Sequence, residues 1–210
     1  MGTSSVCFLD PDLVEASNRN RQMFTLEDVG KPKAHRLLSN LAPFATARAH
    51  LRGFFMPFED WLVKFGRRSR FEMICCGVDS IPTMANVARF GVKTKTPVIF
   101  INVSENGEAC RVFIQRPLAN APCFVCYLPD ALAPRVVSRT PCLPVPGIAD
   151  ILHVAVGLGA RAAMGEIMGE PIGEYNCRDF TFGGIDLIRT IVKKPDCPLC
   201  SDREPDHGAL

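Results

Sequence analysis

Two CxxC pairs constrain this chain of 210 residues more than any other feature of its sequence. Cys123 and Cys126 form the first pair and Cys197 and Cys200 the second, with the 70 residues from 127 to 196 between them. Four thiolates in two short turns are a typical ligand set for tetrahedral Zn²⁺, because each turn lets two sulfurs converge on one ion. A closed site of four sulfurs leaves no position for water, so we expect a structural zinc that staples the C-terminal tail to the body. The alternatives are chance pairs in a cysteine-rich chain and a redox CxxC motif.

The N-terminal segment and the composition indicate the cellular compartment and argue against membrane and nucleic-acid partners. The N-terminal segment lacks a basic start, and Asp10, Asp12 and Glu15 interrupt it where a signal peptide keeps an apolar stretch. We therefore expect a cytoplasmic protein. In a reducing compartment its ten cysteines are better explained as metal ligands, nucleophiles or buried residues than as disulfides. Charged residues break the apolar tract at 148–168, which argues against a membrane span. The net charge of +2 provides no global field for nucleic acid.

Apolar runs that alternate with helical patterns predict an α/β fold. We expect strands within 6–9, 45–51, 72–78 and 96–103, and helices within 32–41, 57–65, 81–90 and 148–168. In the helix at 57–65, Trp61 and Phe65 should point inward. The turn signal before residues 109–115 predicts an antiparallel edge strand. We therefore expect a mostly parallel sheet flanked by helices, in a single domain spanning 1–210.

Acidic residues follow two of the expected strands. Asp10 comes after VCFL and Asp79 after an apolar run ending in GV. In open parallel sheets the ligand crevice lies beyond the carboxyl ends of the strands, so both carboxylates could serve one pocket. The alternative is that each caps a loop or a helix. Asn18, Arg21 and Lys33 follow Asp10 closely, and an arginine fork with a lysine in a first helical turn predicts a nucleotide triphosphate pocket.

A second glycine motif suggests a different cofactor. Gly157, Gly159 and Ala162 fit G-x-G-x-x-A after an apolar run, and Asp179 follows at the distance of a ribose-binding acid. The competing interpretation places these glycines inside a helix, where close packing on a neighbour explains them. Of these two interpretations, the dinucleotide-dependent oxidoreductase is the weaker hypothesis.

The segment DPDLVEASNRNRQ followed by DVGKPKA resembles the adenylating enzymes of the ThiF, MoeB and HesA family, relatives of the ubiquitin-activating enzymes. That family's pattern is close to D-x-D-x-V-x-x-S-N-L-x-R-Q and then G-x-x-K. The resemblance continues through Asp79 and the two CxxC pairs. It implies a Rossmann-like ThiF-type fold with a nucleotide-binding part at 6–116, and with the crossover loop, long helix and zinc-bound tail at 117–210.

The resemblance also implies the chemistry. ATP and Mg²⁺ would be held by these residues: Asp10 on the ribose, Ser17, Asn18, Arg21 and Lys33 around the phosphates, and Asp79 on the metal or nucleotide. Arg21 would also act in catalysis. The carboxylate of the C-terminal glycine of a ubiquitin-like or sulfur-carrier protein would attack the α-phosphate, giving an acyl adenylate and pyrophosphate. Cys142 resembles the family's loop cysteine and would accept the acyl group as a thioester.

The sequence departs from the family pattern at several points. It begins at the second strand, so the family's glycine-rich phosphate loop and first strand are expected to be absent. Arg19 and Ser80 replace the usual leucine and asparagine. Two hypotheses therefore stand: an adenylyltransferase, and a non-catalytic zinc-stapled partner or scaffold subunit. A homodimer, or a heterodimer with a related subunit, is expected from the resemblance.

Overall fold

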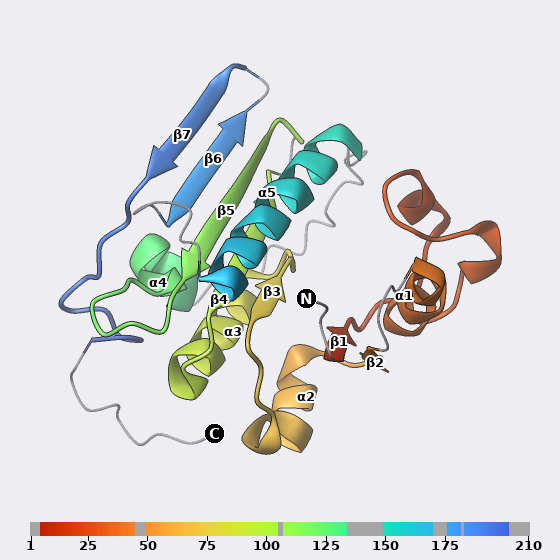
Figure 1. The fold of residues 1–210 in the computed structure, drawn as a ribbon, viewed down its shortest axis with the longest axis horizontal. Coiled ribbons are helices and arrows are strands. Elements are labelled where there is room, and N and C mark those ends of the chain that lie inside the picture. The colour runs from red at the N-terminus through yellow and green to blue at the C-terminus, as the bar shows by residue number, and fades with distance from the viewer. Residues whose placement is uncertain are drawn as a thin grey trace. The chain divides into compact units, whose positions relative to one another are not determined.

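The computed structural model describes residues 5–44, 49–104, 107–133, 149–169, 176–181 and 183–201. It divides into two compact units, Met1–Ser69 and Arg70–Leu210. Each unit is described by itself, with the element labels of Figure 1. The expected division at residue 116 stays a prediction.

The first unit is built on a βαβ arrangement. Two parallel strands, β1 (Ser5–Leu9) and β2 (His50–Phe54), are joined through the helix α1 (Lys33–Leu41). Helix α1 lies so close to β2 that a Cβ atom on Gly53 would stand 2.9 Å from the Ala34 carbonyl oxygen. A side chain at that position would force the helix away from the strands.

Shorter helices complete the first unit. They are the 3₁₀ turns η1 (Ala16–Asn20), η2 (Leu26–Asp28), η3 (Ala42–Phe44) and η4 (Gly66–Arg68), and the helix α2 (Phe58–Phe65). Trp61 of α2 is buried as expected, whereas the expectation for Phe65 was wrong, since its side chain is 40% exposed. Phe65 is the last residue of the helix, and its ring contacts those of Phe54 and Trp61 in tilted arrangements while part of it stays exposed.

The second unit contains a mixed five-stranded sheet in the order β3-β4-β5-β6-β7. The strands are β3 (Ile74–Cys76), β4 (Val98–Val103), β5 (Ala109–Gln115), β6 (Cys177–Thr181) and β7 (Ile185–Arg189). Strands β3 and β4 are parallel, and the other neighbours are antiparallel. The α/β class is confirmed, and the antiparallel part, expected as one edge strand, extends over β5, β6 and β7.

Helices cover both faces of this sheet (Figure 1). They are α3 (Ile81–Thr94), α4 (Phe124–Tyr127), η5 (Pro129–Leu132) and α5 (Ala149–Met168). Helix α5 packs on the face that carries Ile99 and Val112, through Ala162. Alternate strand residues point to opposite faces. Phe100 therefore turns to the other face, where its ring stacks on Phe124 of α4 with the centroids 4.5 Å apart.

Helix α5 decides between the two interpretations of the second glycine motif. Gly157 and Gly159 both lie inside this helix, far from any strand-to-helix turn, so the dinucleotide motif has the wrong structural context. A Cβ atom on Gly159 would overlap the side chain of Ile101, so close packing explains this glycine. Gly157 faces open space, and packing does not explain it.

The same helix also bears on the membrane question. Among the described residues, one helical segment, Asp150–Met168, is long enough and apolar enough to cross a bilayer, judged by length and composition alone. The sequence argument excludes a span here because of its charged residues. In the structure, Ile151 and Ala155 are fully buried against the sheet, which is the packing of a helix that covers a sheet.

Candidate functional site

The loop after β1 carries most of the expected nucleotide-binding residues. Backbone hydrogen bonds close it at its base: the Val14 amide donates to the Lys31 carbonyl (2.8 Å), the Gly30 amide to the Val14 carbonyl (2.8 Å) and the Lys33 amide to the Asp12 carbonyl (2.9 Å). Gly30 has a φ of +82°, a conformation that glycine adopts without strain. The loop therefore leaves β1 and returns to the first residue of α1 as one closed segment.

Asp10, Asp12 and Lys33 are linked at the base of this loop. The Asp12 amide donates to Asp10 Oδ1 (2.8 Å), which is the loop-capping role considered for Asp10. Lys33 Nζ forms an ion pair with Asp12 Oδ2 (2.8 Å). The Lys33 side chain is 15% exposed and the Asp12 side chain 62% exposed, so the ion pair is open to solvent on the Asp12 side only.

Asn18 organises the next part of the loop. Its buried side chain accepts a hydrogen bond from the Glu15 amide (2.9 Å) through Oδ1. Ser17 Oγ donates to Glu15 Oε2 (3.1 Å), and Arg21 Nη1 donates to the Ser17 carbonyl (2.8 Å). These contacts hold the Arg21 guanidinium against its own loop. The roles of Ser17, Asn18 and Arg21 toward phosphate stay predictions.

Asp79 belongs to the second unit. It is exposed and lies between β3 and α3, next to Ser80, whose side chain accepts a hydrogen bond from the Thr83 amide (3.4 Å) at the start of α3. The structure therefore groups Asp10, Ser17, Asn18, Arg21 and Lys33 in one loop and its flanks, and describes Asp79 with the other unit. A common pocket for Asp10 and Asp79 stays a prediction.

The four cysteines of the two CxxC pairs converge as expected. Their sulfur atoms all lie within 4.8 Å of one another. The Cys123 and Cys197 sulfurs are 3.6 Å apart, and the Cys126 and Cys200 sulfurs are 3.4 Å apart. Four sulfurs about 2.3 Å from one tetrahedral ion are roughly 3.8 Å apart, so this donor set fits Zn²⁺. None of the cysteines in the described ranges forms a disulfide.

The protonation of these thiols also suits a metal site. Burial raises the pKa of Cys123 strongly and that of Cys200 to about 12, so both thiols keep their protons unless a cation replaces them. Burial acts in the same direction on Cys197, but backbone amides of Leu199 and Cys200 donate to its sulfur and bring its pKa below the ordinary value.

A buried glutamine supports the first CxxC turn. Gln115 Nε2 donates to the Ala88 carbonyl of α3 (3.0 Å), and Gln115 Oε1 accepts from the Phe124 amide (3.0 Å), directly after Cys123. From the other side, the Lys194 amide donates to the Cys126 sulfur (3.4 Å). The metal site is thus tied to the sheet, to α3 and to the C-terminal segment.

Cys142, the expected nucleophile, lies outside the described residues, so its role stays a prediction.

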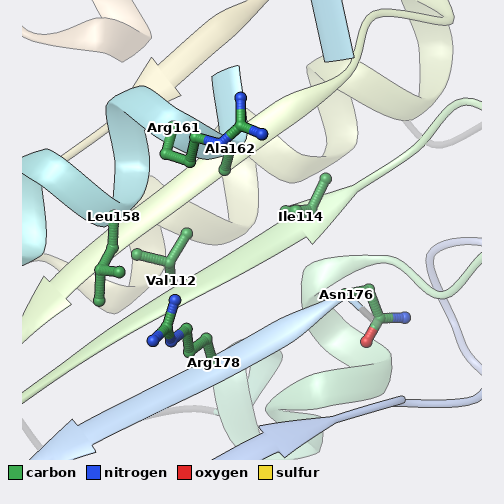
Figure 2. A pocket seen from close by; sticks show the side chains of 7 residues that line it. All are labelled: Val112, Ile114, Leu158, Arg161, Ala162, Asn176 and Arg178. Carbon is green, nitrogen blue, oxygen red and sulfur yellow. The ribbon is translucent and has the colours of Figure 1, made fainter. Parts of the chain in front are cut away.

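A small hollow is present on the α5 face of the sheet (Figure 2). Val112 and Ile114 form its floor, and Arg161 and Arg178 lie at its edge. Its cavity volume is about 20 Å³, room for roughly one water molecule and too little for a nucleotide.

Sequence reasoning missed Asp12 and Asp28. Asp12 pairs with Lys33, and Asp28 is fully buried in the same loop. The signal for Asp12 was the second acid of the D-x-D pattern. Asp28 carried no signal of its own, because its partners Arg36 and Asn40 lie farther along the chain.

The fold and the site define an α/β protein with a long closed loop between its first strand and helix, and with four cysteines that could hold a metal ion. Comparison with known proteins agrees with this class. The ThiF family model matches residues 1–198, and the chain therefore belongs to the ThiF family.

Two curated relatives show the same likeness over most of the chain. The sulfur carrier protein adenylyltransferase of Thermus thermophilus is 27% identical over 223 residues, with 100% of this chain and 77% of the relative covered. The SAMP-activating enzyme E1 of Haloferax volcanii is 27% identical over 222 residues, with 96% of this chain and 73% of the relative covered.

Solved structures of E. coli MccB share the fold. The MccB structure with ATP superposes with a TM-score of 0.74 at 16% identity and covers 94% of this chain. The chain spans about 60% of the length of MccB.

Proposed function

We propose that this protein is an adenylyltransferase that uses ATP and Mg²⁺ to activate the C-terminal glycine of a ubiquitin-like or sulfur-carrier protein. The observation that carries the proposal is the closed loop between β1 and α1, which groups Asp10, Asn18, Arg21 and Lys33 in the order of the family motif. Membership of the ThiF family supports it, as do the activities for which the two relatives are named.

The cationic residues of the loop suit the charge of ATP. Lys33 is the first residue of α1, and the free backbone amides and positive end of the helix dipole at that terminus also favour an anion. Arg21 offers a planar fork for phosphate oxygens. In our proposal, Lys33 exchanges Asp12 for a phosphate and Arg21 turns from the Ser17 carbonyl to the phosphate chain.

In the proposed reaction, an oxygen of the glycine carboxylate attacks the α-phosphorus. A carboxyl–phosphate bond forms, the bond between the α-phosphorus and the α,β-bridging oxygen breaks, and pyrophosphate leaves. Asp10 would hold the ribose hydroxyls, and Asp79 would hold Mg²⁺ or the nucleotide. Mg²⁺ would supply charge neutralisation at the phosphates. The protein accelerates this step by positioning the reactants and by neutralising charge.

We propose a second step at Cys142. Its thiolate attacks the acyl carbon, AMP leaves, and the carrier remains attached as a thioester. We further propose that the enzyme acts in the cytoplasm as a homodimer, or as a heterodimer with a related subunit. Zn²⁺ has no place in either step; bound to the four cysteines it stabilises the fold around the C-terminal segment.

Pyrophosphate exchange into ATP tests the first step. The probe is a peptide that ends in a free glycine carboxylate, and the same peptide with a C-terminal amide is the control. We expect exchange with the acid only. Replacing Lys33 by Ala should lower exchange roughly 10- to 100-fold, the range for a charge-assisted contact worth about 1.5–3 kcal/mol. Lys31→Ala is the matched control, because Lys31 is exposed in the same loop.

The remaining outcomes separate the two hypotheses. Asp79→Ala should also abolish exchange without unfolding the protein, and unchanged activity would remove Asp79 from the pocket. Cys142→Ala should keep exchange but lose a carrier adduct that thiols reverse. A folded chain that binds zinc and shows no exchange would favour the non-catalytic scaffold.

A further inference from the structure

Asp28 is a buried charge that the proposed chemistry does not use. Its side chain is fully buried at the end of η2. The carboxylate accepts hydrogen bonds from the Thr25 amide (2.8 Å), the Thr25 hydroxyl (3.0 Å) and Asn40 Nδ2 (2.8 Å), and it pairs with Arg36. A carboxylate without such donors would be costly in this position, so the site is built for the charge.

These donors come from two elements. Thr25 belongs to the loop, while Arg36 and Asn40 lie one turn apart on the same side of α1. Asn40 Nδ2 also donates to the Met23 carbonyl (2.7 Å), so the helix grips the loop at a second point. The loop is therefore clasped to the helix that begins with Lys33.

Arg21 lies between two anchors in this arrangement. On one side is Asn18, whose carbonyl accepts the Arg21 amide (3.2 Å). On the other side is Met23, which Asn40 holds against α1. The distance between Arg21 and the start of α1 therefore depends on the clasp around Asp28.

We propose that Asp28 is a positioning residue for the nucleotide. It holds the loop against α1, so that the side chains of Arg21 and Lys33 bind the same phosphate chain. This role rests on the proposed function. The hydrogen bond from the Thr25 amide, with those of Asn40 and Arg36, holds the pKa of Asp28 far below its ordinary value, so the clasp is charged at physiological pH. An uncharged substitute of the same size, Asn, breaks the arrangement because its amide group cannot accept from so many donors.

The activity test compares the Asp28→Asn variant with the unmodified chain in the exchange assay. We expect the KM for ATP to rise about tenfold while kcat stays within about twofold, because contacts made equally before and during the reaction affect KM. Asn40→Ala should act in the same way, and the double variant should show no more than the larger single effect. Asp60→Asn, at an exposed position of α2, is the matched control.

Limited trypsin digestion provides a readout independent of ATP. Arg19 and Arg21 lie in the loop, and we expect faster cleavage there in Asp28→Asn and Asn40→Ala than in Asp60→Asn, measured well below the melting temperature of each variant so that every chain is folded. An unchanged KM in the folded variants overturns the role of Asp28. A loss of kcat in proportion to the folded fraction, with KM constant, overturns it as well.

Failure of the proposed function gives a different result. In that case the unmodified chain shows neither exchange nor ATP binding by calorimetry, whatever the trypsin pattern, and the positioning role falls with it. An unmodified chain that exchanges pyrophosphate, beside an Asp28→Asn variant with the same KM, rejects the positioning role alone.

Discussion

Replacing Cys197 by Ser is the sharpest test of the metal site. The Cys197 side chain is 2% exposed, and its sulfur lies 3.6 Å from that of Cys123, which belongs to the first CxxC turn 74 residues earlier. A serine there removes one of the four thiolates without changing the size of the side chain much. It therefore weakens the link between the C-terminal segment and the sheet.

The magnitude follows from the energetics of closed zinc sites. Structural zinc contributes about 10–16 kcal/mol to the folding of small zinc domains, so one thiolate of four corresponds to roughly 2.5–4 kcal/mol. For a chain of this size a loss of 1 kcal/mol lowers the melting temperature by about 2–4 °C. We therefore expect Cys197→Ser to melt about 5 to 16 °C below the unmodified protein.

The assay combines thermal unfolding with zinc content, measured by mass spectrometry on the same sample. The control variant is Cys75→Ser, because Cys75 is exposed and lies outside the cluster. A chelator should lower the melting temperature of the unmodified protein and of the control, and should change Cys197→Ser much less. A Cys197→Ser variant that keeps one zinc per chain and its melting temperature would refute the structural zinc.

Three further predictions concern the fold and the loop. Lys95 ends α3 with a φ of +54°, so Lys95→Gly should raise the free energy of unfolding by about 1 kcal/mol in urea titration; no gain would mean that the left-handed conformation costs nothing here. In α5, Gly159→Ala should destabilise by about 1–3 kcal/mol, because its Cβ overlaps Ile101, whereas Gly157→Ala should stabilise by up to about 1 kcal/mol; equal effects would contradict the packing. Folding lowers the pKa of Asp28, so its contribution to stability is present above about pH 4 and is lost as the pH falls further. The free energy of unfolding of Asp28→Asn should therefore fall less steeply below about pH 4 than that of the unmodified protein. The same pH dependence in both proteins would contradict the buried charge.

The sequence predicted the features that depend on local spacing. Two CxxC turns can converge on one ion wherever the chain brings them together, and the convergence of the four cysteines was predicted for this reason, while bound zinc stays a prediction. Gly159 was expected inside the helix at 148–168, and it lies in α5. The turn before residue 109 predicted an antiparallel neighbour for β4.

Features that depend on contacts between distant residues could not be predicted. The burial of Asp28 needs Arg36 and Asn40 to face the loop, and nothing in a single sequence pairs these residues. The ion pair between Lys33 and Asp12 depends on how the loop closes at its base. Phe65 shares a helix side with Trp61, yet at the end of α2 the neighbouring elements leave it partly exposed.

Trapping the activated carboxylate tests the central claim most directly. The purified chain is incubated with ATP, Mg²⁺, hydroxylamine and a peptide ending in a free glycine carboxylate. Adenylation predicts AMP and peptide hydroxamate in equal amounts, and neither product from the peptide amide. A folded, zinc-containing chain that forms no AMP, or that forms it equally with the amide, would contradict the account.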